Sequence, residues 1–145
     1  MLVESRLHFA GYEVNNLQFK LNKEENREAE FKICPAFTKE IEDNGDGTYD
    51  VRLIVSIEST KEKPMLFDLV VDITGHFVLA DDSGDEEFRE QIINQNTVAI
   101  LFPFLRTIVA SLTTTANVSA LMLPIINLSA AFDAEQNSEE KKLNS

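Results

Sequence analysis

The sequence predicts an α+β fold in which a four-stranded antiparallel sheet is followed by a long helix and a short C-terminal helix. Two hydrophobic periods, one in each half of the chain, lead to this prediction. Over residues 7–80, apolar residues recur at every second position, as in strands with one buried face. From residue 96, apolar residues recur at the i, i+3, i+4, i+7 spacing of an amphipathic helix. Strands and helices do not alternate along the chain, so a parallel sheet is not expected.

Chain length and composition are those of one globular domain. The 145 residues are 43% hydrophobic and 26% charged, which is enough to bury a core without disulfides or metals. Residues 1–136 are expected to form a single domain, and the polar residues 137–145 a disordered tail. The chain has one cysteine, Cys34, so no internal disulfide is expected.

The charge balance narrows the classes of partner. Asp and Glu number 25 against 13 Lys and Arg, for a net charge of -12, which repels nucleic acid phosphates and anionic membranes. Residues 1–14 include Glu4 and no unbroken apolar run, so no signal peptide is expected. No segment approaches the roughly 20 apolar residues of a membrane span. Nucleic acid and membrane insertion are therefore not expected, and a cytoplasmic location is.

Four strands are predicted in order, over the residue ranges 7–21, 30–42, 49–57 and 65–79. Pro35 has no backbone N–H, so the second strand should lie at a sheet edge or carry a bulge. Gly75 should interrupt the register of the fourth strand with a bulge or bend. The links at residues 43–47 and 59–64 have the composition of hairpin turns, which favours an antiparallel meander.

The helical half is predicted as two helices separated at Asn96. The acidic residues 86–87 suit the first turn of a short helix that ends near Asn94. Asn96 should cap the next helix, which Pro103 should kink and which the polar residues 113–117 should end. An apolar stripe on this helix is suited to packing on the sheet; its members are Val98, Leu101, Phe102, Leu105, Ile108, Val109 and Leu112.

A second face of the same helix lies outside the stripe. Ile100 and Phe104 are apolar, and the small residues Thr107 and Ser111 continue their row. Such a face suits packing against another copy of the chain; one wide core face is the alternative.

The chain beyond this helix is again apolar. Residues 120–128 cannot form a regular helix across Pro124, so an extended apolar linker is expected. Residues 129–136 are predicted to form a short last helix that carries Phe132.

Catalytic and metal-binding patterns are weak in this sequence. His8 and His76 fall on different predicted strands, and Cys34 has no histidine near it in the chain. Residues 42–47 resemble the start of a calcium loop, but the twelfth position is Leu53 rather than an acid. Phosphate loops, dinucleotide fingerprints and nucleophile elbows are not found. An enzyme, a metal site and a cofactor are therefore not expected.

Two segments resemble the SecB family of export chaperones. The run Ile-Leu-Phe-Pro-Phe-Leu-Arg at residues 100–106 is similar to the ILFPYAR-type sequence that begins the family's main helix. Residues 123–128 are similar to the family's linker before its last helix. The four strand patterns, with the Gly75-x-Phe77 end of the fourth, also resemble the family, and the resemblance covers roughly residues 5–133.

This resemblance implies a homotetrameric cytoplasmic chaperone, built as a dimer of dimers, that holds non-native polypeptides without ATP. It implies that Ile100 and Phe104, with Thr107 and Ser111 on the same face, make the tetramer contact. It also implies that client polypeptides lie in apolar grooves between the second strand, the linker and the last helix. The corresponding positions here are Phe31, Ile33, Phe37, Leu121, Leu123, Ile126, Leu128 and Phe132.

The family passes clients to the motor SecA through an acidic outer face of the sheet. The corresponding positions in this chain are Asn16, Lys20, Asp68, Val70 and Asp72. The two aspartates keep the face acidic, but the family's pattern is not preserved. A partner other than SecA therefore stays open, as in the specialised chaperones of toxin–antitoxin systems.

The predicted function is thus an ATP-independent chaperone, or holdase, for unfolded or precursor polypeptides in protein export. The alternative is a dedicated chaperone or binder of a single partner, such as an antitoxin. A third class, a small-molecule binding protein or enzyme on this fold, predicts a closed pocket with convergent polar groups. The sequence offers no cluster of that kind.

Overall fold

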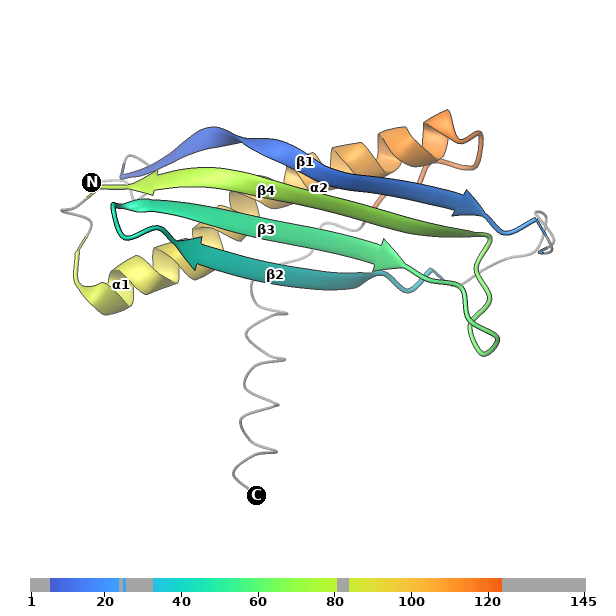
Figure 1. The fold of residues 1–145 in the computed structure, drawn as a ribbon, viewed down its shortest axis with the longest axis horizontal. Helices are drawn as coiled ribbons and strands as arrows, with labels where there is room; N and C mark the ends of the chain where they lie inside the picture. The colour runs from blue at the N-terminus through green and yellow to red at the C-terminus, as the bar shows by residue number, and fades with distance from the viewer. Residues whose placement is uncertain (1–5, 24, 26–32, 81–83, 124–145) are drawn as a thin grey trace, which may run out of the picture.

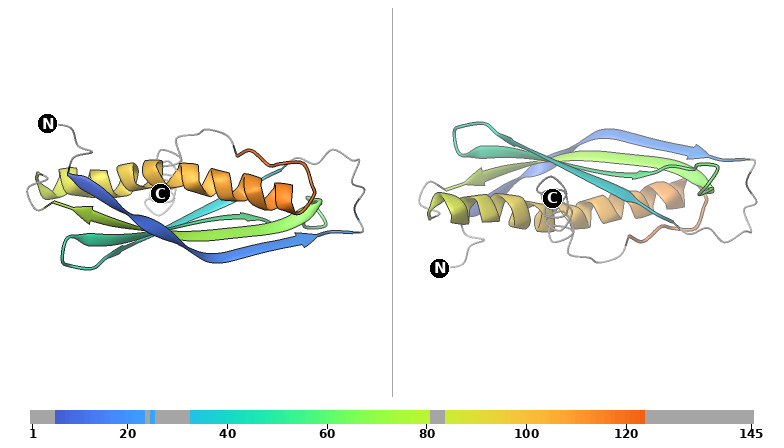
Figure 2. Two further views of the ribbon diagram at one scale, coloured as in Figure 1. Left: turned by 90° about the horizontal axis from the view of Figure 1, so that it is seen from above. Right: turned by 90° about the horizontal axis from the view of Figure 1, so that it is seen from below.

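One face of a four-stranded antiparallel sheet is covered by a long helix in the computed structural model (Figures 1 and 2). The structure describes residues 6–23, 25, 33–80 and 84–123. The strands are β1 (Leu7–Leu21), β2 (Ala36–Asp43), β3 (Thr48–Ile57) and β4 (Phe67–Leu79). The predicted α+β fold class is therefore confirmed, while the predicted last helix lies outside the described residues.

The strand order is β1-β4-β3-β2. The last three strands form an antiparallel meander, whereas the predicted meander included all four. β1 lies beside β4 instead of β2, with Leu7 opposite Leu79 and Leu21 opposite Phe67. The longer link between β1 and β2 allows this crossing to the other edge. β2 lies at the opposite edge, as Pro35 predicts, and begins directly after that proline.

Two irregularities in β1 change which residues face the helix. The register between β1 and β4 shifts between Phe9 and Tyr12 and again between Val14 and Asn16. Gly11, at the first shift, has a φ of 105°, which favours glycine. The strict alternation expected over the first strand therefore does not hold at these shifts, since Tyr12 takes the position opposite Gly75.

Gly75 does not interrupt β4, contrary to the prediction. Its register with β3 is continuous, with Val51 opposite Gly75. A Cβ atom at this position would lie 2.9 Å from Leu101 Cδ1 and 2.9 Å from Phe77 Cε2. The glycine therefore serves close packing of the helix on the sheet, and the bulge lies in β1 instead.

The helical half is continuous from Glu86 to Thr115. It comprises α1 (Glu86–Gln91), a π-helical turn η2 (Ile92–Asn96) and α2 (Thr97–Thr115). The carboxylate of Asp85 accepts the Phe88 N–H and caps the start. Asn96 does not begin a new helix, contrary to the prediction, because its backbone is helical and its side chain caps nothing. Ile92 and Ile93 are buried, so the core holds the chain helical through the π-helical turn.

The core lies between α2 and the inner face of the sheet. Val98, Leu101, Leu105 and Val109 are fully buried, which confirms the predicted stripe. They pack on alternate residues of β3 and β4, whose inward side chains are also buried. Pro103 lies inside the helix on its exposed side.

The helix Glu86–Thr115 corrects the expectation that no segment is apolar and long enough for a membrane span. Its most apolar window of 18 residues has a mean hydropathy of 1.6, so by length and composition alone it could cross a membrane. In this fold its apolar stripe packs on the sheet instead. A core helix of a soluble domain commonly has these properties.

Candidate functional site

Along β2, half-buried apolar side chains lie at an open edge of the sheet. In the described part of the chain β2 pairs only with β3. The ring of Phe37 lies 6.0 Å from the ring of Phe102 on α2, at an interplanar angle of 70°. Ile33, just before the strand, also packs on the core while part of its side chain stays accessible.

The segment 118–123 follows α2 and turns back along it. Helix α2 ends at Thr115, as predicted, and Asn117 adopts a φ of 61° that reverses the chain. The N–H of Leu121 donates to Thr113 Oγ1 at 2.9 Å, and Arg106 Nε donates to the Leu123 carbonyl at 2.7 Å. The extended linker predicted from the sequence is confirmed up to Leu123.

The same row of α2 contacts both β2 and the segment 118–123. Phe102, Arg106 and Thr113 follow one another at spacings of four and seven residues, which places them on one side of a helix. Phe102 contacts Phe37 of β2, and Arg106, one turn away, binds the Leu123 carbonyl. The fold therefore brings β2 and this segment to neighbouring turns of one helix.

The predicted client-binding residues do not all have the same exposure. Ile33, Phe37 and Leu121 are half-buried, whereas Leu123 is only 1% exposed and belongs to the core. Met122, which was not predicted, is 63% exposed. Alternation of inward and outward side chains in an extended segment would have identified it. The other four predicted residues lie outside the described ranges; they are Phe31, Ile126, Leu128 and Phe132.

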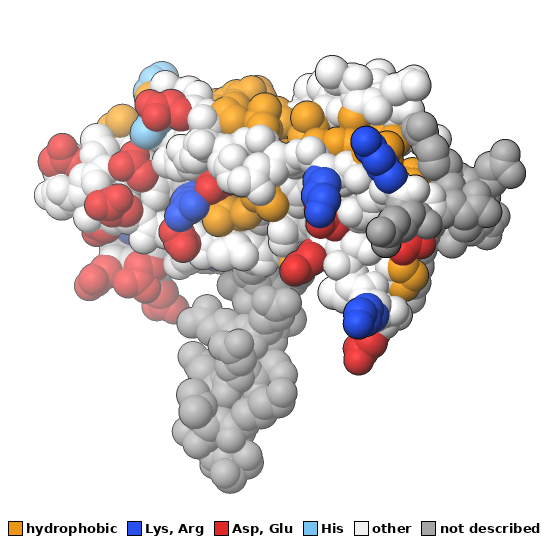
Figure 3. Space-filling view, turned by 45° about the vertical axis from the view of Figure 1, so that its right-hand side comes forward, with side chains coloured by type: hydrophobic (Ala, Val, Ile, Leu, Met, Phe, Trp, Pro, Cys, Tyr) orange, Lys and Arg blue, Asp and Glu red, His pale blue; other side chains and the backbone are white. Residues whose placement is uncertain are grey.

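A second apolar surface, the β1–α2 surface, lies at the opposite edge of the sheet. Phe104 of α2 packs against Phe9 and Tyr12 of β1, with ring centroids 5.5 and 5.0 Å apart. Along β1 it continues through the exposed side chains of Val14 and Leu17. Figure 3 shows hydrophobic side chains gathered along this upper edge of the molecule.

This surface includes the predicted oligomer face of the helix. Thr107 and Ser111 are exposed and Ile100 is half-buried, as a face outside the core stripe should be. The contribution of Tyr12, Val14 and Leu17 was not predicted. The first irregularity of β1 turns Tyr12 and Val14 toward the helix, and the second returns Leu17 to the face of Phe9. No sequence pattern located both irregularities in advance.

The outer face of the sheet carries a polar row that crosses all four strands. Arg52 of β3 donates from Nε to Asp72 Oδ1 of β4 at 2.9 Å and from Nη1 to Glu40 Oε2 of β2 at 3.2 Å. Asn15 of β1 donates to Asp72 Oδ1 at 3.0 Å. The Arg52 guanidinium and the Asn15 amide hold the pKa of the nearly buried Asp72 carboxyl below its usual value.

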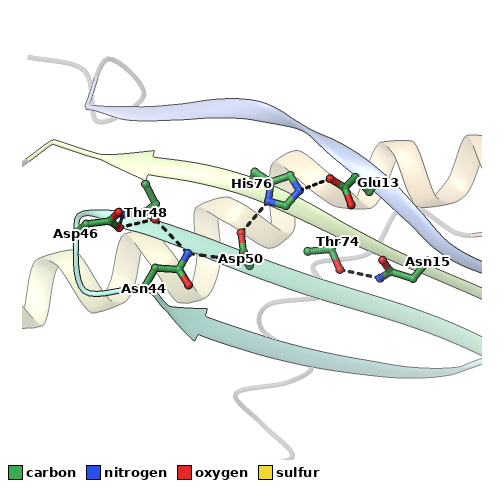
Figure 4. Close-up of polar contacts among 8 residues, drawn as sticks. All are labelled: Glu13, Asn15, Asn44, Asp46, Thr48, Asp50, Thr74 and His76. Carbon is green, nitrogen blue, oxygen red and sulfur yellow. Dashed lines mark hydrogen bonds and ion pairs between the residues drawn. The ribbon is translucent and has the colours of Figure 1, made fainter.

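A second polar row is centred on His76 (Figure 4). Its Nδ1 lies 2.7 Å from Asp50 Oδ1 of β3, and its Nε2 lies 3.3 Å from Glu13 Oε1 of β1. These two carboxylates, Asp50 first, raise the pKa of His76. The imidazole therefore links three strands on the outer face. Among the described residues, no three His, Cys, Asp or Glu side chains gather as metal ligands.

The five positions expected to face a motor lie on the outer face. In the register, Asn16 is opposite Asp72 and Lys20 is opposite Asp68. Asp68 Oδ1 accepts the Ser59 N–H at 2.8 Å and the Asn22 side-chain amide at 3.2 Å. Asp72 is thus engaged within the sheet and Asp68 by the residues that follow β1 and β3, while the half-buried Val70 lies between them along β4.

Three comparisons place the chain among known proteins. A family model described as preprotein translocase subunit SecB matches residues 12–139. An uncharacterized protein of Methanocaldococcus jannaschii is 26% identical over 144 residues, or 94% of this chain and 92% of that protein. The protein-export protein SecB of Anaplasma phagocytophilum is 32% identical over 97 residues, or 65% of this chain and 61% of that protein.

A solved structure has a similar fold. The SecB-like chaperone of Mycobacterium tuberculosis, in complex with a ChAD peptide from the HigA1 antitoxin, superposes with a TM-score of 0.69 at 14% identity. The superposition covers 86% of this chain and 93% of that chain. The family model spans most of the sequence and the predicted SecB-like fold is present. The chain therefore belongs to the SecB family of chaperones.

Proposed function

We propose that this protein is an ATP-independent holdase that binds non-native polypeptides along β2 and the segment 118–123. The observation that carries the proposal is the edge of β2, unpaired by any described residue, beside half-buried apolar side chains of two elements. An extended polypeptide can pair its main chain with such an edge and place its apolar side chains in adjacent hollows. Main-chain pairing is independent of sequence, which suits a protein with many clients.

The segment 118–123 supplies adaptable apolar contacts to this site. Met122 is unbranched and polarisable, and its exposure leaves it available to a bound chain. Leu121 is partly accessible, and the buried Leu123 forms part of the floor below it. Phe31, Ile126, Leu128 and Phe132 complete the proposed client-binding set.

The proposed active form is a homotetramer, built as a dimer of dimers, in the cytoplasm. The β1–α2 surface supports this assembly, because Phe104 and Tyr12 are aromatic, adjacent and incompletely covered. Contiguous exposed apolar side chains of two elements usually mark a protein interface. Ile100, Thr107 and Ser111 continue the surface along the helix.

Aggregation of several unrelated, chemically unfolded proteins tests the proposal. Broad suppression without ATP is expected, by a particle several chains in mass. Met122→Asp should weaken suppression, because a charge at the site opposes apolar clients. Ser119→Asp, a change to the same charge at another exposed position of the segment, is the matched control and should suppress normally. If the unaltered protein suppresses no aggregation, the holdase proposal fails.

A dedicated binder of one partner is the second candidate. It is favoured by the structural similarity to a SecB-like chaperone solved with an antitoxin peptide. Suppression restricted to a single protein or peptide would select this candidate. Delivery to SecA is proposed only as one route for clients, since Asp68 and Asp72 of the outer face are already hydrogen-bonded to other residues of the chain.

A further inference from the structure

Thr113 is a buried hydroxyl with a partner outside its own helix. Its side chain is fully buried, and its Oγ1 donates to the Val109 carbonyl at 2.9 Å or to that of Ala110 at 3.1 Å. The same oxygen accepts the Leu121 N–H at 2.9 Å. A hydroxyl donates one hydrogen bond and accepts two. Thr113 therefore adds a side-chain hydrogen bond to the segment 118–123, beside the backbone hydrogen bond from the Val118 N–H to the Thr113 carbonyl at 3.2 Å.

Arg106 makes the second attachment, two turns earlier on the helix. Its Nε donates to the Leu123 carbonyl at 2.7 Å. Among the described residues, no carboxylate lies within ion-pair distance of its guanidinium. The guanidinium binds the main chain, and it fixes the end of the segment that Thr113 holds at Leu121.

The two hydrogen bonds fix the orientation of the side chains between them. Leu121 and Leu123 point toward the core, and Met122 points away from it, with 63% of its side chain exposed. Apolar packing alone tolerates sliding of an extended segment, whereas two directed hydrogen bonds set its register. A segment held in its binding conformation loses less entropy when a client binds.

We infer that Thr113 and Arg106 are positioning residues for client binding, which hold the segment 118–123 beside α2 as a preformed wall of the site. This inference rests on the proposed function. Neither side chain needs to touch the client, because each acts through the main chain of the segment.

Two pairs of substitutions test the inference. Thr113→Val keeps the shape but removes the acceptor for the Leu121 N–H, and Thr113→Ser restores it. Thr114→Val is the matched control, since the Thr114 hydroxyl binds only the Ala110 carbonyl of its own helix. Arg106→Met keeps the unbranched stem without donors, and Arg106→Lys restores a donor and the charge.

Two readouts are measured on the full chain: hydrogen exchange of the Leu121 amide, and the affinity for fluorescent, reduced and alkylated α-lactalbumin, which stays unfolded. Thr113→Val and Arg106→Met should speed the exchange and weaken binding by about tenfold, the effect of losing one buried hydrogen bond. Thr113→Ser, Arg106→Lys and Thr114→Val should stay within about threefold of the unaltered protein.

The remaining outcomes overturn either the inference or the proposed function. Faster exchange with unchanged affinity, or unchanged exchange in both variants, overturns the inference and leaves the holdase proposal standing. An unaltered protein that binds no unfolded client overturns the proposed function itself. Loss of binding by Thr114→Val as well would assign the effect to the helix end and also overturn the inference.

Discussion

The ring of Phe104 on α2 lies 5.0 Å from the ring of Tyr12 on β1, and each side chain is still 37% exposed. The contact joins a helix and an edge strand that are about 90 residues apart in sequence. Since both rings are only incompletely covered, the pair has apolar surface available to a second copy.

Phe104→Asp should dissociate the oligomer while the sheet and helix stay formed. A carboxylate at the centre of the β1–α2 surface would be buried without a partner on assembly. Light scattering should show a smaller mass, and circular dichroism an unchanged helix content.

Phe88→Asp is the matched control for this experiment. Phe88 is 38% exposed on α1, so the same substitution alters a similar side chain outside the proposed surface. Its mass should stay that of the unaltered protein. An unchanged mass for Phe104→Asp, with the helix intact, would contradict the proposed interface.

Gly75→Ala should destabilise the protein by about 1–3 kcal/mol, because the added Cβ overlaps the buried Leu101 side chain. Leu101→Ala alone should cost about 2–5 kcal/mol through the cavity it leaves. The double variant should be more stable than the sum of the two predicts, since each change relieves the other. Urea unfolding measures all three, and strict additivity would mean that the helix does not approach Gly75 as closely as described.

Stability should fall as pH rises through the folded pKa of His76. Because that pKa is raised, the contribution of His76 is fully present below its unfolded value of about 6.5 and is lost above its folded value. His76→Gln should remove this decline, measured as the free energy of unfolding at pH 6 and pH 8. His8→Gln, which removes the other histidine, should retain it. A decline that persists in His76→Gln would assign the effect to another group.

Stability should also fall in acid as Asp72 becomes protonated. Its pKa is lowered in the folded protein, so its contribution is present above the unfolded value of about 3.9 and is lost as pH falls through the folded value. Asp72→Asn should have a lower free energy of unfolding near neutrality, and that free energy should decrease less as the pH is lowered. Glu42 is exposed on the same face. The free energy of unfolding of Glu42→Gln should therefore decrease in acid as it does in the unaltered protein.

Much of the fold followed from local periodicity. Alternation over residues 49–57 and 65–79 located β3 and β4, because both pack one face on the helix and expose the other. The stripe from Val98 to Val109 was predicted for the same reason. The resemblance implied roles for Phe37 in client binding and for Phe104 in the oligomer contact, and both side chains are incompletely buried.

Features that depend on contacts distant in sequence could not be predicted. The neighbour of β1 is set by pairing with β4, and the period of β1 itself carries no information about it. Gly75 was predicted to interrupt its strand, but its lack of a Cβ atom instead makes room for Leu101 of the helix. Asn96 is of a residue type that favours helix N-caps. Burial of Ile92 and Ile93 nevertheless keeps the helix continuous. The hydrogen bond between Thr113 and the Leu121 N–H could not be predicted, because it forms only where the chain folds back along α2.

The pairing of β1 with β4 has a consequence for how this chain is made. Leu7 must wait for Leu79 to emerge from the ribosome before the sheet can close. At about 5–20 residues per second, that interval is roughly 4–14 s. During it, the start of the first strand has no native strand neighbour. A nascent chain of this protein is therefore itself a temporary candidate for the protection that its folded form is proposed to give.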